Sequence, residues 1–253
     1  MTLRSLATLV AFALAAVPAG AASTSTRDDA ARAARPVPIL MYHAIGNAPA
    51  GAPYPELYVS RSAFAAQIAW LARNGYHAVT LRRVYDSWTR DAPLPARAVV
   101  LSFDDGYPGD VSVALPLLRR HRWPGVLNLH IGNLIPAKVR RLVAARWEVD
   151  SHTFTHSDLT TLDSAQLRHD VRDSRTWLRG VFHVPIDFFC YPSGRYDANV
   201  IAAVRAAGYL GAMTTNYGVA SPADGMYTLD RVRVNGSDGA AGLAAKLRSL
   251  RDG

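Results

Sequence analysis

Short apolar runs alternate with amphipathic segments along most of this chain, and this alternation limits the folds that it can adopt. The apolar runs have the length and composition of strands and lie at residues 37–43, 77–80, 98–104, 125–131, 147–152, 186–192 and 210–215. Strand–helix repetition is typical of a parallel sheet covered by helices. The number of repeats favours a closed or nearly closed α/β barrel over an open doubly wound sheet.

Three of the intervening segments carry clear helix signals. The first begins after Ser60, a good N-cap residue, and ends before Gly75. The second covers residues 164–180, and the third begins after Asp197 and ends at Gly208. Because no internal repeat and no second apolar–polar pattern occurs, we expect a single domain.

The first 25 residues have the features of a secretory signal peptide. Arg4 precedes an apolar stretch at 6–17, and small residues that suit a signal peptidase follow it. The alternative is a retained membrane anchor, but the apolar stretch is shorter than the roughly 20 residues that a span needs. We therefore predict a signal peptide at 1–25, a linker at 26–36 and one domain at 37–253. This organisation indicates a secreted, periplasmic or cell-envelope protein with no membrane span in the mature chain.

Composition narrows the class of partner. With 253 residues, of which 49% are hydrophobic, the chain can bury a sizeable core. Its net charge of +8 favours an anionic cell-surface polymer, although a genome-wide bias toward alanine and arginine explains the charge equally well. No dense basic run with interleaved aromatic residues occurs, which argues against a nucleic-acid partner.

The chain has a single cysteine, Cys190, which excludes an internal disulfide. As a separate prediction, we expect the protein to be a monomer.

Polar residues end several of the apolar runs. These residues are His43 in the first run, Asp104 and Asp105 in the third, Ser151 and His152 in the fifth, and Tyr191, Pro192 and Gly194 in the sixth. Because the C-terminal ends of barrel strands meet at one mouth, we expect these residues to converge there. Two adjacent carboxylates in a poorly solvated place repel each other unless a cation, a metal ion or a shared proton lies beside them.

His152 and His156 lie four residues apart in the sequence SHTFTHSDL. On a helical turn, or in a tight loop, this spacing presents both imidazoles to the same side, as in two-histidine metal sites. Two histidines and one carboxylate would leave positions open for water and substrate. Alone, such a pair is more often two surface histidines, and paired aspartates are often a solvated turn. Their place at two strand ends of one repeating pattern favours the metal site.

The motifs SFDDG, HTFTH and YPSGRYD, preceded by PILMYHAI, resemble those of the polysaccharide deacetylases with a NodB-homology domain, carbohydrate esterase family four, in the branch that opens with a MYH motif. The resemblance covers residues 36 to about 235. It implies a distorted (β/α)7 barrel that hydrolyses acetyl groups on sugars, most often on N-acetylglucosamine units. The implied partner is an acetylated polysaccharide. The implied cofactor is one divalent metal ion, zinc, with cobalt, nickel and manganese as alternatives.

The resemblance also assigns roles to individual residues. Asp104 is similar to the catalytic base, and Asp105, His152 and His156 to the metal ligands. His43 is similar to the general acid of the MYH branch. We expect the neighbouring carboxylates to keep the pKa of His43 high enough for proton donation.

The chain departs from the family pattern at two positions. Many members have an arginine two residues before the proline of an RxPY motif, where it orients the base, and this chain has Cys190 there. Arg231 and Arg233 are the candidates to replace that cation. The tyrosine after the proline is replaced by Ser193, whose backbone N–H can still stabilise an oxyanion.

Tyr191 and Pro192 are predicted to lie with Ser193 on the oxyanion and substrate side of the site. His130, at the end of the fourth apolar run, could face the mouth, but we favour its interpretation as a packed core histidine. The departures at positions 190 and 193 keep a catalytically weakened carbohydrate-binding relic open, and an esterase for O-acetyl groups of xylan-type glycans is the other alternative.

Overall fold

The computed structural model describes residues 35–252, which form a closed barrel of parallel strands. The ring follows the order β1 (Ile39–Tyr42), β10 (Leu229–Arg233), β9 (Gly211–Tyr217), β8 (Phe188–Cys190), β7 (Glu148–Ser151), β6 (Val126–Leu129) and β5 (Ala98–Asp104). β1 closes the ring because it pairs in parallel with both β10 and β5. β4 (His77–Ala78) adds a short parallel pairing to the start of β5. The prediction of a single-domain (β/α)7 barrel is confirmed.

The predicted signal peptide at 1–25 and most of the predicted linker at 26–36 lie outside the described residues. Within the part of the chain that is described, no helix has both the length and the apolar character needed to cross a bilayer.

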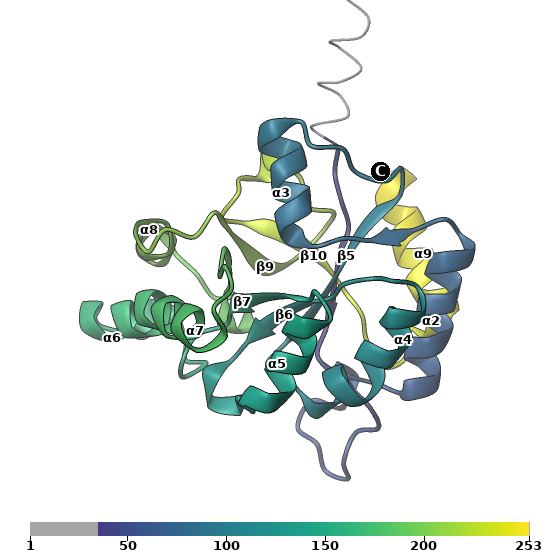
Figure 1. Ribbon diagram of the computed structural model, residues 1–253, viewed down its shortest axis with the longest axis horizontal. Helices are drawn as coiled ribbons and strands as arrows, with labels where there is room; N and C mark the ends of the chain where they lie inside the picture. The colour runs from purple at the N-terminus through teal and green to yellow at the C-terminus, as the bar shows by residue number, and fades with distance from the viewer. Residues whose placement is uncertain (1–34, 253) are drawn as a thin grey trace, which may run out of the picture.

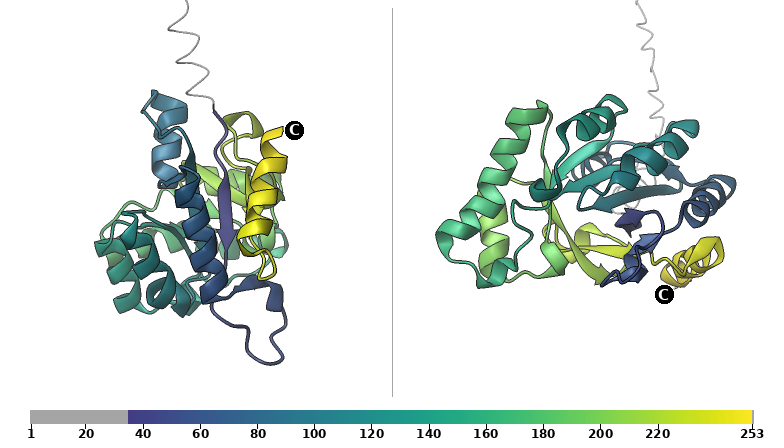
Figure 2. Two further views of the ribbon diagram at one scale, coloured as in Figure 1. Left: turned by 90° about the vertical axis from the view of Figure 1, so that its right-hand side faces the viewer. Right: turned by 90° about the horizontal axis from the view of Figure 1, so that it is seen from below.

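Helices surround the ring of strands (Figures 1 and 2). They are α2 (Arg61–Arg73), α3 (Leu81–Arg90), α4 (Leu115–Arg120), α5 (Pro136–Ala144), α6 (Ser164–Arg168), α7 (Ser174–Phe182), α8 (Ala198–Ala206) and α9 (Gly239–Asp252). In Figure 1, α3 lies at the end of the barrel opposite the protruding loop of residues 46–57. Leu81 and Val84 of α3 pack with residues of the barrel interior and close that end. The C-terminal ends of the strands therefore form the open mouth.

The capping residues predicted for two helices make the expected hydrogen bonds. The Ser60 hydroxyl accepts from the Ala63 N–H at 3.2 Å, and the Asp197 carboxylate accepts from the Val200 N–H at 2.8 Å. The segment expected as one helix over 164–180 is instead α6, a π-helical turn and α7. That turn covers residues 169–173, and the sequence period does not reveal it because the apolar spacing continues through it.

β10 is the one strand of the barrel ring, as the structure describes it, that the sequence pattern does not predict. Its sequence LDRVR contains two arginines, a composition typical of an exposed segment. Arg231 is nevertheless fully buried inside the barrel. The apolar run at 186–192 also forms a shorter strand than expected, because β8 ends at Cys190 and the chain turns through a 3-10 helix, Pro192–Gly194.

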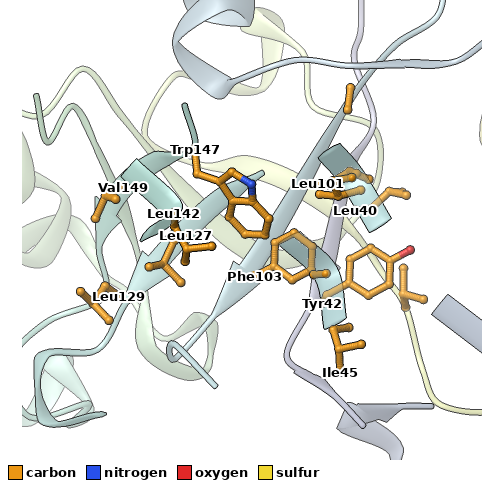
Figure 3. Packing of buried hydrophobic residues seen from close by; sticks show 14 of the residues in the cluster. Leu40, Tyr42, Ile45, Leu101, Phe103, Leu127, Leu129, Leu142, Trp147 and Val149 are labelled. Atoms are coloured by element: carbon orange, nitrogen blue, oxygen red, sulfur yellow. The ribbon is translucent and has the colours of Figure 1, made fainter. Parts of the chain in front are cut away.

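Alternate strand residues pack on opposite sides of the barrel wall. On the outer side, Tyr42 stacks on Phe103 with ring centroids 5.4 Å apart, and Phe103 lies 5.0 Å from the Trp147 ring (Figure 3). On the inner side, a second apolar cluster includes Ile39 and Val100. Packing on both faces holds the strand ends rigidly, so polar side chains at the mouth have fixed positions.

The inner face also contains a buried carboxyl group in β7. Oδ1 of Asp150 accepts from the Phe188 N–H at 3.0 Å, whereas Oδ2 has no hydrogen-bond partner among residues 35–252. Burial raises the pKa of Asp150 to about 7, and the charge of Asp187 adds to this effect. Glu148 lies on the same face, and burial together with Asp150 raises its pKa as well. The barrel interior therefore holds carboxyl groups that resist ionisation.

We predict that Asp150→Asn stabilises the fold increasingly as the pH rises from 5 to 8. A carboxyl group whose folded-state pKa exceeds its unfolded value of about 4 costs stability as the pH rises between the two values, whereas an amide does not titrate. The gain in the free energy of unfolding, measured by urea denaturation, should grow by on the order of 2 kcal/mol over this range. The exposed Asp91→Asn serves as the control and should show a flat difference. A flat difference for Asp150→Asn would contradict the prediction.

Candidate active site and metal centre

An open cleft of about 490 Å³ lies at the mouth of the barrel, a volume typical of small-molecule sites. The predicted residues that line it are His43, Asp104, Asp105, His152, His156, Tyr191, Ser193 and Arg233. Of the predicted site residues, Pro192 and Arg231 do not line the cleft, because both are buried beside it. The strand ends therefore bring these distant segments together at one place.

Asp105 and the two histidines form a group that fits a metal ion. Oδ1 of Asp105 lies 3.5 Å from Nε2 of His152 and 3.4 Å from Nε2 of His156, and the three ligand atoms are all within 4.8 Å of one another. This Oδ1 atom is buried and has no hydrogen-bond partner within the described part of the chain. A buried, unsatisfied carboxylate oxygen facing two imidazole nitrogens is the arrangement that a divalent cation would satisfy.

The ring of His152 is oriented by a backbone group. Its Nδ1 atom lies 2.7 Å from the carbonyl oxygen of Cys190, so the proton resides on Nδ1 and the lone pair of Nε2 faces Asp105. Burial lowers the pKa of His152 to about 4 and keeps the ring neutral at pH 7. A neutral imidazole with a fixed tautomer is the form that binds a metal.

The HTFTH segment is a tight loop rather than a helical turn. Thr153 and His156 have positive φ angles of 71° and 58°, and the Thr153 hydroxyl accepts from the His156 N–H at 2.9 Å. Asp170, in the π-helical turn, accepts from the N–H groups of Phe154 and Thr155, each at 2.9 Å. The interruption of the predicted helix thus supplies the carboxylate that holds the histidine loop in place.

Asp104 takes part in a separate network on the same strand end. Arg231 donates to Oδ1 at 2.8 Å and to Oδ2 at 2.9 Å, and the Asn128 amide donates to Oδ1 at 2.7 Å. Burial alone would raise the pKa of Asp104, but the positive charge of Arg231 outweighs it and holds this pKa well below its usual range. Of the two candidate arginines, the structure places Arg231 against Asp104 and leaves Arg233 without a hydrogen bond to it.

A second group of potential ligands overlaps the first. Asp104, His152 and Cys190 also have ligand atoms within 4.8 Å of one another. Both oxygens of Asp104 are already occupied by Arg231, and burial raises the pKa of the Cys190 thiol well above its usual value. Because metals bind the thiolate and not the thiol, this second set is the poorer one.

His43 lies beside Asp104, with its Nε2 atom 3.7 Å from Oδ2. Burial lowers the pKa of His43, and the charges of Asp104 and Asp105 oppose this effect without overcoming it. The expectation that the carboxylates keep this pKa high is therefore wrong. Desolvation of the imidazolium outweighs their attraction, and the ring is neutral at pH 7.

Tyr191 and Ser193 of the YPSG segment line one part of the cleft. Ser193 has a positive φ of 52°, an uncommon conformation for a residue with a side chain, and the following Gly194 passes so close to Thr215 that a side chain would clash. The Tyr191 ring stacks on Tyr196 at 4.9 Å, and its hydroxyl donates to the Tyr227 carbonyl. This turn places Ser193 on the lining of the cleft.

The interpretation of His130 as a packed core histidine is wrong. His130 is partly exposed, lines the cleft, and has its ring centroid 5.4 Å from that of His156. It follows β6, so the rule that strand ends carry the site residues would have identified it. Asn128 has no such signal, since an amide inside an apolar strand does not reveal which neighbour it contacts.

Comparison with known proteins matches this geometry. The family model described as polysaccharide deacetylase matches residues 91–212. The protein "Putative polysaccharide deacetylase YxkH" of Bacillus subtilis (strain 168) is 29% identical over 221 residues, which cover 85% of this chain and 77% of that protein. The Streptococcus pyogenes deacetylase PplD in complex with acetate superposes with a TM-score of 0.78 and 26% identity, over 84% of this chain and 98% of that one. Over residues 91–212, just under half of its length, the chain is therefore similar to the polysaccharide deacetylase family.

A shorter match is to a relative that is named for its activity. The poly-beta-1,6-N-acetyl-D-glucosamine N-deacetylase of Escherichia coli (strain K12) is 41% identical over 68 residues, which are 27% of this chain and only 10% of that protein. The match therefore concerns a segment and not the whole relative.

We predict that Arg231→Gln lowers the free energy of unfolding by about 3–5 kcal/mol, because it leaves the buried Asp104 carboxylate without its counter-ion. Urea denaturation at pH 7 measures this loss. Arg233→Gln is the matched control on the same strand, and because it breaks no ion pair it should cost less than about 1 kcal/mol. Equal losses for the two variants would show that the Arg231–Asp104 pair does not stabilise the barrel.

Proposed function

We propose that this chain is a secreted, metal-dependent hydrolase that removes acetyl groups from polymers of the N-acetylglucosamine type. The observation that carries the proposal is the division of two adjacent carboxylates between two networks. Asp104 pairs with Arg231, whereas Asp105 faces His152 and His156 with an unsatisfied oxygen. Asp104 is thus held by hydrogen bonds outside the ligand group and would transfer protons, while its neighbour Asp105 would bind a cation.

Asp105, His152 and His156 would hold one divalent metal ion, for which we propose zinc. When bound, such an ion lowers the pKa of a water molecule and polarises the acetyl carbonyl. Three protein ligands leave coordination positions open, as a catalytic site requires. Cobalt, nickel and manganese accept the same nitrogen and oxygen donors, and metal analysis of the purified protein distinguishes them.

Asp104 and His43 would move the protons of amide hydrolysis. Asp104 takes a proton from the attacking water, and Arg231 fixes the direction of its carboxylate at some cost in basicity. The neutral His43, 3.7 Å from Asp104, can receive this proton and donate it to the departing amine nitrogen. A relay of this kind reconciles the lowered pKa of His43 with its role as the acid.

The Ser193 backbone N–H would stabilise the oxyanion, with Tyr191 and Pro192 supporting the turn that presents it. One such contact typically contributes about 3 kcal/mol to the barrier. Secretion is proposed from the predicted signal peptide at 1–25. The names of two relatives, the N-deacetylase of Escherichia coli and the chitooligosaccharide deacetylase of Bradyrhizobium sp. (strain ANU 289), support an N-acetylglucosamine-type substrate.

The proposal of a carbohydrate-binding relic loses its main support in the structure. It depends on Cys190 standing in place of the base-orienting arginine, but Arg231 supplies a guanidinium to Asp104 from β10. The residues that we propose for proton transfer and for metal binding line the same cleft.

The metal-loaded protein should release acetate from chito-oligosaccharides and much less from O-acetylated xylan, and a chelator should abolish this release until a divalent metal is restored. Acetate is measured enzymatically after incubation with each substrate. Faster release from the xylan would favour the esterase alternative. Stoichiometric metal without acetate release from either glycan would favour the relic.

Asp104→Asn should retain about one equivalent of metal and lower kcat by about 10²–10⁴-fold, since it removes the proton acceptor but none of the ligands. His152→Ala should lose the metal, and the exposed His121→Ala should change neither property. Metal content is measured by atomic emission and kcat by acetate release. A near-normal rate for Asp104→Asn would mean that another group is the base.

A further inference from the structure

Arg233 is a half-buried arginine in the cleft whose partner is not supplied by the described residues. It lies at the end of β10 and lines the same cleft as His43, Asp104 and Asp105. Among the side chains that the structure describes, its guanidinium has no hydrogen-bond or ion-pair partner. A partly desolvated guanidinium carries five N–H donors, so an acceptor at this position would be stabilising.

The backbone of Arg233 is held firmly in place. Arg233 pairs in register with Met41 of β1, and the Val234 N–H donates to the Met41 carbonyl at 3.1 Å. The Arg233 carbonyl accepts from Nζ of Lys246, which is fixed in turn by an ion pair with Asp238. The side chain therefore starts from a rigid strand end at the mouth.

Nearby carboxylates do not neutralise Arg233. Asp104 is saturated by Arg231 and Asn128, and Asp105 faces the two histidines. Glu56, which also lines the cleft, acts on Arg233 through its charge and forms no hydrogen bond with it. Arg231 stands two residues earlier on the same strand, so two guanidinium groups share this side of the mouth.

We propose that Arg233 binds a carboxylate carried by the glycan, on the sugar unit that adjoins the acetylated one. This inference rests on the proposed deacetylase function and adds that the preferred substrate is an acidic glycan. A planar guanidinium recognises a carboxylate through two parallel N–H···O bonds, and a contact of this kind is stronger than one to a neutral hydroxyl. The net charge of +8 would attract the same class of polymer over a longer range.

Two carboxylate sources share this chemistry: a uronic acid unit, and the lactyl ether of a muramic acid unit. The test compares three disaccharides, in which N-acetylglucosamine is linked to glucuronic acid, to N-acetylmuramic acid or to a second N-acetylglucosamine. Dissociation constants are measured by calorimetry on the metal-loaded Asp104→Asn protein, so that no acetate is released during the titration. The titrations are repeated on three double variants, in which the Asp104→Asn protein also carries Arg233→Gln, Arg233→Lys or the surface control Arg119→Gln.

The unmodified cleft should bind one or both acidic disaccharides about 10- to 100-fold more tightly than the neutral one. Arg233→Gln should remove most of this preference, Arg233→Lys should keep part of it, and Arg119→Gln should keep all of it. The acidic disaccharide that binds more tightly identifies the source of the carboxylate.

No preference for either acidic disaccharide, no measurable binding of any of the three, or an equal loss on charged and neutral ligands in Arg233→Gln would overturn the inference. Acetate release by the wild-type chain is measured in parallel on the same three disaccharides. If none of the three disaccharides releases acetate but the acidic ones still bind more tightly in calorimetry, the proposed deacetylase function is contradicted. The carboxylate-binding role of Arg233 is then still supported.

Discussion

The ion pair between Arg231 and Asp104 is the interaction on which the arrangement of the mouth depends. Arg231 reaches across the barrel interior from β10 to β5, and also donates to the Thr214 carbonyl and lies 3.2 Å from the Ser102 hydroxyl. A buried charge pair is stabilising only when its remaining donors and acceptors are satisfied, and here Asn128 completes the set. The network therefore fixes the end of β5, from which both aspartates extend.

The backbone at the end of β5 separates the two aspartates. Asp104 has extended strand geometry and points into the barrel, whereas Asp105 has a positive φ of 72° and its N–H donates to the Asn128 carbonyl. Gly106 continues the turn with a φ of 82°, where a side chain would meet Leu129. Adjacent carboxylates thus point into different networks, which resolves the repulsion that their proximity in sequence would otherwise cause.

The sequence predicts those features of the fold and site that local patterns encode. The run at 98–104 coincides with β5, and the caps at Ser60 and Asp197 are local hydrogen bonds. The strand-end rule gathers the site residues because the ends of parallel strands meet. It does not indicate which of Arg231 and Arg233 contacts Asp104, since that choice depends on the register between β10, β1 and β5. The burial that lowers the pKa of His43 is likewise a property of the assembled barrel.

The departure at Cys190 illustrates why a missing motif residue does not by itself indicate a lost activity. The sulfur of Cys190 lies 3.9 Å from Oδ2 of Asp104, close to the position from which a longer cationic side chain would reach that carboxylate. In a barrel interior, side chains from several strands point toward the same place. A guanidinium on β10 can therefore neutralise the Asp104 carboxylate in place of an arginine on β8. What the chemistry requires is a cation beside Asp104, and the fold offers more than one strand from which to provide it. The carbonyl of Cys190, which orients His152, is independent of its side chain.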